Sequence, residues 1–414
     1  MNYTDYINKD IQCDCGRLHS SNIREIIIMD NAIKELTAII ERNNYKSIYI
    51  AADENTWKAA GKLILKSIEQ AARGTDKRRE IKITKHIFKD NRLVADEAAI
   101  ATLLVHAPSE GDFVIGIGAG TINDLCKLIS KRLKTDYAIV ATAPSMDGFS
   151  SGISMLALNA VKTPVITKQP DYILCDLRIL CKAPKHMTAS GAAVLLGNYV
   201  TLTDLGIAEL INNETYCREG ENLIRKSTEA AEELIRKHIG DETRDFLQDK
   251  RNIKIIMESL IMSGMAKGFI GEFILMPQNV QCLSTYLEML FMQEEKQILP
   301  YGAGIAVSTV KLIKLYGKIK KEKPDFEMAK ENINFKEKYA ILEENREEAV
   351  SIISALPKAD YIKDLLKALD MPYKLKHIGI SKKNLKDSIK YADNSVCGYG
   401  ALCVKLEVGK SKSQ

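Results

Sequence analysis

FVIGIGAGTINDLCK, residues Phe113–Lys127, is the stretch that decides the fold. It begins as a short apolar run, breaks into glycines, and continues with apolar residues at helical spacing. Glycine lets the backbone approach a phosphate closely, and the N–H groups at a helix N-terminus favour negative charge. The stretch therefore predicts a buried strand, a turn suited to a nucleotide phosphate, and a helix that Thr121 caps through its hydroxyl. An ordinary tight turn in an α/β domain is the alternative.

Strand and helix patterns alternate on both sides of this stretch. Short β-rich runs occupy residues 47–53, 80–88, 113–118, 137–144 and 172–177, and helical patterns occupy residues 57–73, 95–105 and 121–132. Strands separated by helices of this length predict a parallel sheet covered by helices. We therefore expect residues 1–180 to form an α/β domain, with residues 1–25 as an N-terminal arm.

The pattern changes after about residue 180. Segments such as AAVLLGNYVTLTDLGIAELI and NIKIIMESLIMSGMAKGFIGEFILM carry apolar residues at helical spacing and little β-type alternation. Charged stretches at residues 214–254 and 318–348 are typical of long exposed helices. The sequence thus predicts a second, all-helical domain over residues 181–414.

The composition excludes several classes of function. The chain has 59 basic and 54 acidic residues, a net charge of +5, which gives no argument for nucleic-acid binding. The basic run Lys311–Lys323 is best explained as a solvated helix face. The sequence has no apolar run of about 18 residues and no export signal, so we expect a cytoplasmic protein without membrane insertion.

The cysteines are nine, an odd number without regular spacing. This usage predicts free thiols in a reducing compartment. Cys13, Cys15 and His19 lie in the segment CDCGRLH, which suggests a metal site. Because no second cysteine pair follows at a zinc-like spacing, we expect no structural zinc there.

Two further segments follow predicted strands. Asp53 ends the strand at residues 47–53, where an acid can accept hydrogen bonds from an adenosine ribose. The segment ATAPSMDGFSSG, residues 141–152, follows another strand and carries small hydroxyl residues and one acid. Ligands of open α/β sheets bind at the carboxyl ends of strands, so these segments favour a nucleotide site. The acid, Asp147, could also be an ordinary turn residue before Gly148.

The sequence also resembles a known family. GAGTINDLCK, ATAPSMDGFSSG and VKTPVITKQPDYILCDLRILCKAP are similar to segments of the glycerol-1-phosphate dehydrogenase family, in its AraM-like bacterial branch. DIQCDCGRLHS and MESLIMSGMA fit the same family. That branch belongs with glycerol dehydrogenase, dehydroquinate synthase and the iron-containing alcohol dehydrogenases. The resemblance spans most of the chain and implies a parallel-sheet dinucleotide-binding domain followed by a helical domain.

The resemblance implies NAD or NADP as cofactor. Its residue-wise correspondence places Asp53, Gly118, Ala119, Gly120, Thr121 and Asp124 along the dinucleotide, with Thr142, Ser145 and Ser151 facing it. It places Asp147 near the substrate and Lys162 near cofactor and substrate. An acid at residue 53 repels a 2′-phosphate and so favours NAD.

The resemblance also implies a divalent metal, held in the family by one Asp and two His of the helical domain. Here the corresponding positions carry Val194, Gln281 and Tyr301, or Pro300 if the alignment slips by one. No histidine lies between residues 239 and 376. The family's arginine-serine stretch before the second ligand is replaced by residues 272–278. Asp204 could act as a substitute acid, but we expect no metal.

Two functions remain open at this point. In the first, the chain reduces a small phosphorylated ketone without metal, and Tyr301 replaces the Lewis acid as proton donor beside Asp147. In the second, it is a nucleotide-binding pseudoenzyme with a regulatory or structural role, and Tyr301 only lines the site. A dehydroquinate synthase-like lyase is disfavoured because that chemistry needs the same metal. We expect a homo-oligomer such as a dimer.

Overall fold

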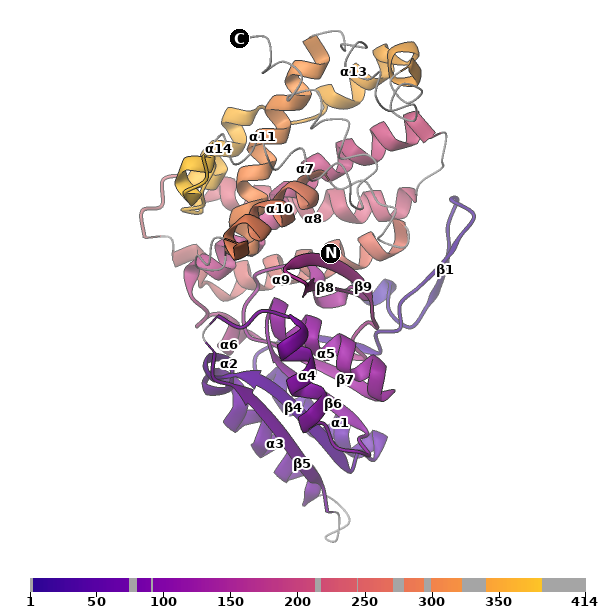
Figure 1. The fold of residues 1–414 in the computed structure, drawn as a ribbon, viewed down its shortest axis with the longest axis vertical. Helices are drawn as coiled ribbons and strands as arrows, with labels where there is room; N and C mark the ends of the chain where they lie inside the picture. The colour runs from indigo at the N-terminus through magenta and orange to yellow at the C-terminus, as the bar shows by residue number, and fades with distance from the viewer. Residues whose placement is uncertain are drawn as a thin grey trace. The chain divides into compact units, whose positions relative to one another are not determined.

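A computed structural model describes residues 3–73, 80–90, 92–212, 217–243, 245–270, 279–293, 299–321 and 340–381. The chain divides into two compact units, whose elements can be followed in Figure 1. The first, called here the sheet unit, contains Met1–Gln12, Leu18–Gly191 and Asp245–Gly268. The second, called the helical unit, contains Cys13–Arg17, Ala192–Arg244 and Phe269–Gln414. The sheet unit thus extends beyond residue 180 and includes a later segment.

The sheet unit is built on six parallel strands, as the alternating pattern predicts. They are β3 (Glu25–Met29), β4 (Ser47–Asp53), β5 (Lys82–Phe88), β6 (Phe113–Gly118), β7 (Asp136–Ala141) and β10 (Tyr172–Asp176). Their order across the sheet is β3-β10-β7-β6-β4-β5. The sequence reading missed β3, and it also missed the antiparallel pairs β1 (Asp10–Gln12) with β2 (Leu18–Ser20) and β8 (Ile153–Leu158) with β9 (Val161–Ile166).

The strand order contains a reversal between β4 and β6. From β4 the chain passes to β5 on one side, whereas from β6 it passes to β7 on the other side. The register sets Ala52 beside Ile117 and Gly118 beside Ala141, so these three strands end at one edge. Such a reversal is where open α/β sheets bind ligands, because the loops leave in opposite directions.

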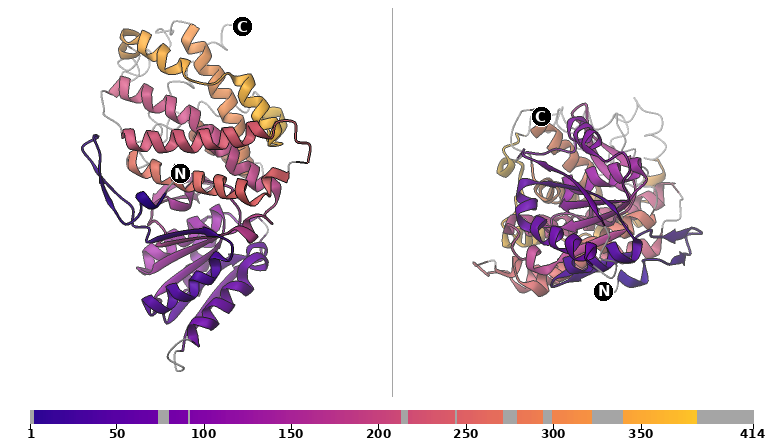
Figure 2. Two further views of the ribbon diagram at one scale, coloured as in Figure 1. Left: turned by 180° about the vertical axis from the view of Figure 1, so that it is seen from behind. Right: turned by 90° about the horizontal axis from the view of Figure 1, so that it is seen from below.

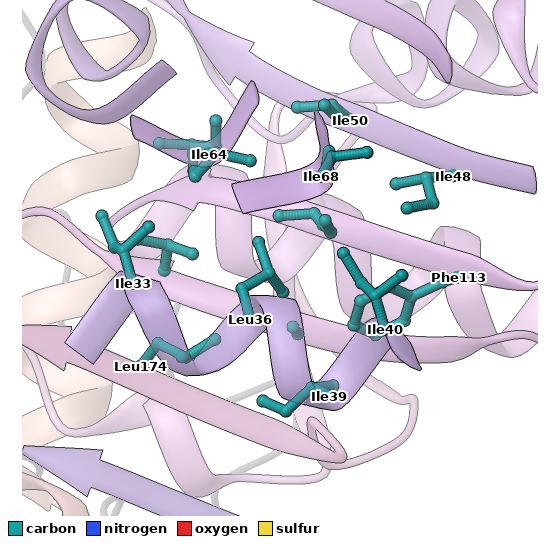
Figure 3. Close-up of a cluster of buried hydrophobic side chains, with 14 of the residues drawn as sticks. Ile33, Leu36, Ile39, Ile40, Ile48, Ile50, Ile64, Ile68, Phe113 and Leu174 are labelled. Atoms are coloured by element: carbon teal, nitrogen blue, oxygen red, sulfur yellow. The ribbon is translucent and has the colours of Figure 1, made fainter. Parts of the chain in front are cut away.

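One face of the sheet is covered by α1 (Glu35–Asn43) and α3 (Lys62–Ala72). Alternate residues of the strands, such as Ile48 and Ile50 of β4, point into a buried apolar cluster with these helices (Figure 3). Leu36 and Ile40 come from α1, at helical spacing, and are fully buried. Each fully buried aliphatic side chain stabilises the folded state by about 1.5–3 kcal/mol, so this cluster holds the two helices against the sheet.

The intervening strand residues face the opposite side. Tyr49 of β4 donates a hydrogen bond to the carbonyl of Leu103 in α4 (Glu97–His106), at 2.9 Å. Next to it, α5 (Gly120–Leu133) packs on β6 and on the β8–β9 hairpin. Figure 2 shows the sheet and its helices from behind and from below. Because the turn that contains the glycines follows β6, it lies at the carboxyl end of the strands, where the strand order reverses.

The helical unit has no strand among its described residues, as the second half of the sequence predicts. Its helices are α7 (Lys185–Asn212, from Ala192 onward), α8 (Arg218–Lys237), α10 (Asn279–Gln293), α11 (Tyr301–Lys321), α13 (Arg346–Ser354) and α14 (Ala359–Ala368). The helix α9 (Lys250–Ile270) belongs mostly to the sheet unit. Within α7, residues Lys185–Leu210 are long and apolar enough to cross a membrane. However, 89% of the apolar 18-residue window in this segment is buried inside the structure, as in a core helix.

Candidate cofactor and active site

The turn between β6 and α5 has the geometry that a phosphate-binding turn needs. Residues 113–118 are buried, whereas Ala119, Gly120 and Thr121 are only half-buried. A Cβ on Gly118 would lie 2.6 Å from the Ile122 side chain, so this position requires glycine. A Cβ on Gly120 would meet nothing closer than Met146 at 3.7 Å, which leaves space beside the helix start.

Thr121 does not have the predicted capping role. The residue that precedes α5 is Ala119, with φ −117° and ψ −138°, and no side chain caps the helix. Thr121 is the second residue of the helix, so its hydroxyl stands inside the first turn. The first turn carries no acidic residue. The uncapped N–H groups and the helix dipole therefore make this end favourable for an anion.

Asp53 lies at the end of β4, next to the end of β6. Its Oδ1 accepts hydrogen bonds from the backbone N–H groups of Asn55, at 2.8 Å, and Thr56, at 2.9 Å. The carboxylate thus caps the short helix α2 (Glu54–Thr56) and is held in one orientation. Its position at the reversal fits a ribose contact, which stays a prediction.

The loop after β7 lies against the same turn. The backbone N–H of Thr142 donates to the carbonyl of Gly118 at 3.1 Å, and Thr142 is buried. Ser145 is half-buried, and its carbonyl accepts a hydrogen bond from Ser190 at 3.1 Å. Ser151 is buried, and its Oγ accepts from the N–H of Ile153 at 3.0 Å. Of the three hydroxyl residues, Ser145 is therefore the most accessible.

Asp147 is the charged residue of this loop, and the structure gives it a partner that the sequence reading missed. Its Oδ2 accepts from Lys267 Nζ at 2.5 Å and from Ser263 Oγ at 3.0 Å, both on α9. The two charged side chains are each 8% exposed. Lys267 interrupts an otherwise apolar helical segment, MSGMAKGF, and this lone buried cation was the signal that could have revealed it.

The pair lies next to the glycine turn. Asn123, in the first turns of α5, donates a side-chain hydrogen bond to the carbonyl of Gly148 at 3.0 Å. Met146 lies beside Gly120. In the sequence, Asp147 lies between Met146 and Gly148, the two residues that contact the start of α5. The buried ion pair is therefore held beside the glycine turn. Removing one partner of a buried pair costs about 3–5 kcal/mol, so Asp147 and Lys267 depend on each other.

Two glycines allow helices to touch this loop with their backbones. A Cβ on Gly264 of α9 would lie 2.1 Å from the carbonyl oxygen of Asp147. A Cβ on Gly191 of α7 would lie 2.0 Å from the carbonyl oxygen of Pro144. Both distances are far below van der Waals contact, so no other residue fits there without movement. The loop position is set by main-chain contacts.

The remaining predicted cofactor residues have partners of their own. Asp124, on α5, forms an ion pair with Lys127 at 3.0 Å, and the Lys127 side chain is fully buried. Lys162 lies on β9 and is half-buried. Their contacts with a dinucleotide stay predictions.

The three positions that the resemblance assigns to the family metal lie in the helical unit. Val194 is buried on α7, while Gln281 on α10 and Tyr301 at the start of α11 are half-buried. The helices are close at this level, because a Cβ on Gly197 would lie 2.6 Å from Ile305 and 3.6 Å from Val280.

These residues do not fit a metal ion of the family type. Valine has no donor atom, and an amide and a phenol are poor replacements for imidazole. The family's arginine-serine stretch corresponds to residues 272–278, which lie outside the described residues. We derive no step through a metal at this position.

Asp204 belongs to a buried hydrogen-bond network of the same unit. Its Oδ2 accepts from the N–H of Asn279 and its Oδ1 from the Asn279 side chain, each at 2.8 Å, and Tyr316 also donates to Oδ1. Burial raises the pKa of Asp204 to about 7, although these hydrogen bonds oppose the shift. Within the described ranges, Asp204 is not part of any group of three or more potential metal ligands.

Among the described residues, six cysteines are free thiols as predicted, one is not, and three of the free ones gather with a histidine. Cys282 is disulfide-bonded, so the prediction that all are free thiols is wrong at this residue. The ligand atoms of Cys13, Cys15, His19 and Cys217 lie within 4.8 Å of one another. We expected no metal here because no second cysteine pair follows at a zinc-like spacing, but a residue distant in the sequence, Cys217, adds a third thiol to the group.

Comparisons with known proteins agree with the fold and the turn. The family model for iron-containing alcohol dehydrogenase matches residues 27–184, which include the glycine turn and the loop with Asp147. The matched residues resemble the iron-containing alcohol dehydrogenases, and the match covers the first part of the chain. The resemblance seen in the sequence is thereby confirmed.

Relatives within the family extend the match to most of the chain. A glycerol-1-phosphate dehydrogenase [NAD(P)+] from Bacillus licheniformis is 27% identical, covering 94% of this chain and 90% of its own. The crystal structure of glycerol dehydrogenase from Schizosaccharomyces pombe has a TM-score of 0.68 at 14% identity, covering 99% and 92%. A sulfoacetaldehyde reductase from Bifidobacterium kashiwanohense, in complex with NAD+, has a TM-score of 0.65 at 10% identity, covering 95% and 99%. The structures share the fold of this chain.

Proposed function

We propose that this chain is an NAD(P)-dependent oxidoreductase that transfers hydride between nicotinamide and a small phosphorylated ketone or alcohol of the glycerol-1-phosphate type. The observation that carries the proposal is the glycine turn at the strand reversal with the buried pair of Asp147 and Lys267 beside it. The relative from Bacillus licheniformis supports the substrate class. NAD is favoured over NADP because Asp53 is held at the end of β4.

The proposed reaction does not use the family metal. Bound NADH would supply a hydride to the carbonyl carbon. The carbonyl oxygen then takes up the electron pair of the broken C=O π bond and must be stabilised. Lys267 holds a positive charge and a proton next to the loop of Asp147, so it can stabilise the oxygen and protonate it, and solvent restores the proton. Tyr301 stays a second candidate donor.

The decisive measurement is NADH oxidation with dihydroxyacetone phosphate, with and without added Ni²⁺ or Zn²⁺. We expect turnover that added metal does not raise. Lys267→Met should lower kcat by about 100-fold, the usual loss for one donor to a developing oxyanion. Tyr301→Phe should have a smaller effect. The double variant Asp147→Asn with Lys267→Met removes the unpaired buried charge and serves as the folding control.

Two outcomes would contradict parts of the proposal. Turnover that depends on added metal and is unchanged in Lys267→Met would show that the lysine does not replace the metal. A wild type that binds NADH but reduces no ketone under either condition would instead favour the nucleotide-binding pseudoenzyme.

A further inference from the structure

We infer that Cys13, Cys15, His19 and Cys217 form a structural zinc site. The four ligand atoms, three sulfurs and one imidazole nitrogen, lie within 4.8 Å of one another. The Sγ atoms of Cys13 and Cys217 are 3.5 Å apart. Two thiolates on one tetrahedral zinc, each at about 2.3 Å from the metal, stand about 3.8 Å apart. The spacing therefore fits shared coordination and is far too long for a disulfide.

The hairpin of β1 and β2 provides three of the ligands. Gly16 at its tip has φ +76°, and its N–H donates to the carbonyl of Cys13 at 2.9 Å. This tight turn folds Cys15 back beside Cys13, and only glycine adopts its backbone conformation readily. His19 follows on the returning strand, where it pairs with Ile11 and is buried. The pairing of β1 with β2 thus brings Cys13, directly after β1, and His19, on β2, to the same end of the hairpin.

Cys217 lies 204 residues after Cys13 in the chain, directly before α8. It is the N-cap of that 20-residue helix, and its Sγ accepts a hydrogen bond from the N–H of Gly220 at 3.2 Å. A helix N-terminus favours negative charge, and the N–H of Gly220 points at this sulfur. The N–H donor also orients the sulfur, as outer partners of metal ligands do.

The ligand set identifies the metal and its role. Three sulfurs and one imidazole in a compact group are typical of structural zinc, which binds four protein ligands and keeps no open position. Such a site performs no Lewis-acid chemistry. It links Cys13 and Cys15, in the hairpin tip Cys13–Arg17, to the start of α8 within the helical unit, and it is independent of the proposed oxidoreductase activity.

The test uses the full chain under reducing conditions. Elemental analysis after dialysis should find one zinc per chain, and Co²⁺ added to stripped protein should give the visible absorption of tetrahedral cobalt-thiolate. Cys217→Ala and the double variant Cys13→Ser with Cys15→Ser should each lose the zinc. Cys181→Ser changes a half-buried thiol elsewhere and should keep it, which makes it the matched control.

The cobalt spectrum needs no variant, so it decides the question even if a cysteine variant misfolds. Octahedral cobalt without thiolate bands, or zinc content equal in wild type and Cys217→Ala, would overturn the inference. Iron bound with cluster-type absorption would overturn the assignment to zinc. Unchanged NADH binding in a zinc-free variant would leave the proposed function intact.

Discussion

Two regions of the molecule depend on different features of the chain for their proposed roles. One is the turn at Gly118–Gly120, and the other is the set of helical positions Val194, Gln281 and Tyr301. The turn depends on backbone geometry, because Gly118 has no room for a Cβ and the strand reversal fixes where it lies. The three helical positions depend only on side-chain donor atoms, and their helices pack without them. The backbone geometry of the turn, set by Gly118, cannot change without damage to the fold. Function held in a few side chains can be exchanged while the fold stays.

The largest expected effect comes from rebuilding the donor set. Val194→Asp, Gln281→His and Tyr301→His together should create a site for one divalent ion with micromolar or tighter affinity, about 8 kcal/mol of binding free energy. Calorimetric titration with Ni²⁺ or Zn²⁺ measures it, in a background that carries Cys13→Ser and Cys15→Ser. The double variant Gln281→His with Tyr301→His lacks the carboxylate and should bind more weakly. Stoichiometric metal in that background without the three changes would show that the family site persists.

The cofactor turn is the opposite case, where one added side chain should abolish function. Gly120→Asp introduces a negative charge at the predicted pyrophosphate position without an internal clash. Like charges in contact cost several kcal/mol, so NADH affinity should fall by about 100-fold or more. Titration calorimetry measures the change. Gly317→Asp, at an open position on α11, is the matched control and should bind NADH normally. Equal affinities in the two variants would exclude this turn as the cofactor site.

The backbone contact at Gly264 tests whether the Asp147 loop is set by main chain. Gly264→Ala should destabilise the protein by about 3 kcal/mol, because the new Cβ would stand 2.1 Å from the Asp147 carbonyl. Urea unfolding measures this. Gly317→Ala has open space and should be neutral or slightly stabilising. A neutral Gly264→Ala would mean that α9 does not touch the loop.

The smallest expected effect concerns Asp204 in the helical unit. Because the folded pKa of Asp204, about 7, lies above the unfolded value of about 4, the wild type loses stability as pH rises from about 4 to about 7. Asp204→Asn lacks this charge, so between pH 5 and pH 8 its stability relative to wild type should rise by about 2 kcal/mol. Urea unfolding at both pH values measures the difference. Asp360→Asn, on the exposed face of α14, should show none. A relative stability that is flat with pH would mean that Asp204 stays ionised or is solvated.

Much of the sheet unit could be predicted because its signals are local. The strand at residues 113–118 is fully buried and reads as a short apolar run with two glycines, and the glycine turn begins at its end. β3 was missed because EIIIM is a short apolar run whose partner, β10, lies about 150 residues later. The strands of the antiparallel pair β1–β2 have three residues each, which is too short to give clear alternation.

The site was less predictable because its contacts are distant in the sequence. Asp147 could be singled out from its loop, but its partner Lys267 is 120 residues away. The same holds for Cys217, which completes a ligand set that Cys13 and Cys15 only begin. Thr121 was placed wrongly because helix onset depends on backbone angles at Ala119, and no side chain caps this helix. The spacing of residues along the chain does not reveal contacts between residues that are more than 100 positions apart.

The contact of Gly264 with the Asp147 carbonyl has a consequence for how this protein can evolve. A side chain that is positioned by its neighbours' side chains moves whenever one of them is replaced. Asp147 is instead carried by a main chain that rests on another main chain, so residues around it can change one at a time while it stays in place. Donor atoms on other helices can therefore be replaced in separate steps that each leave a folded protein on which selection can act.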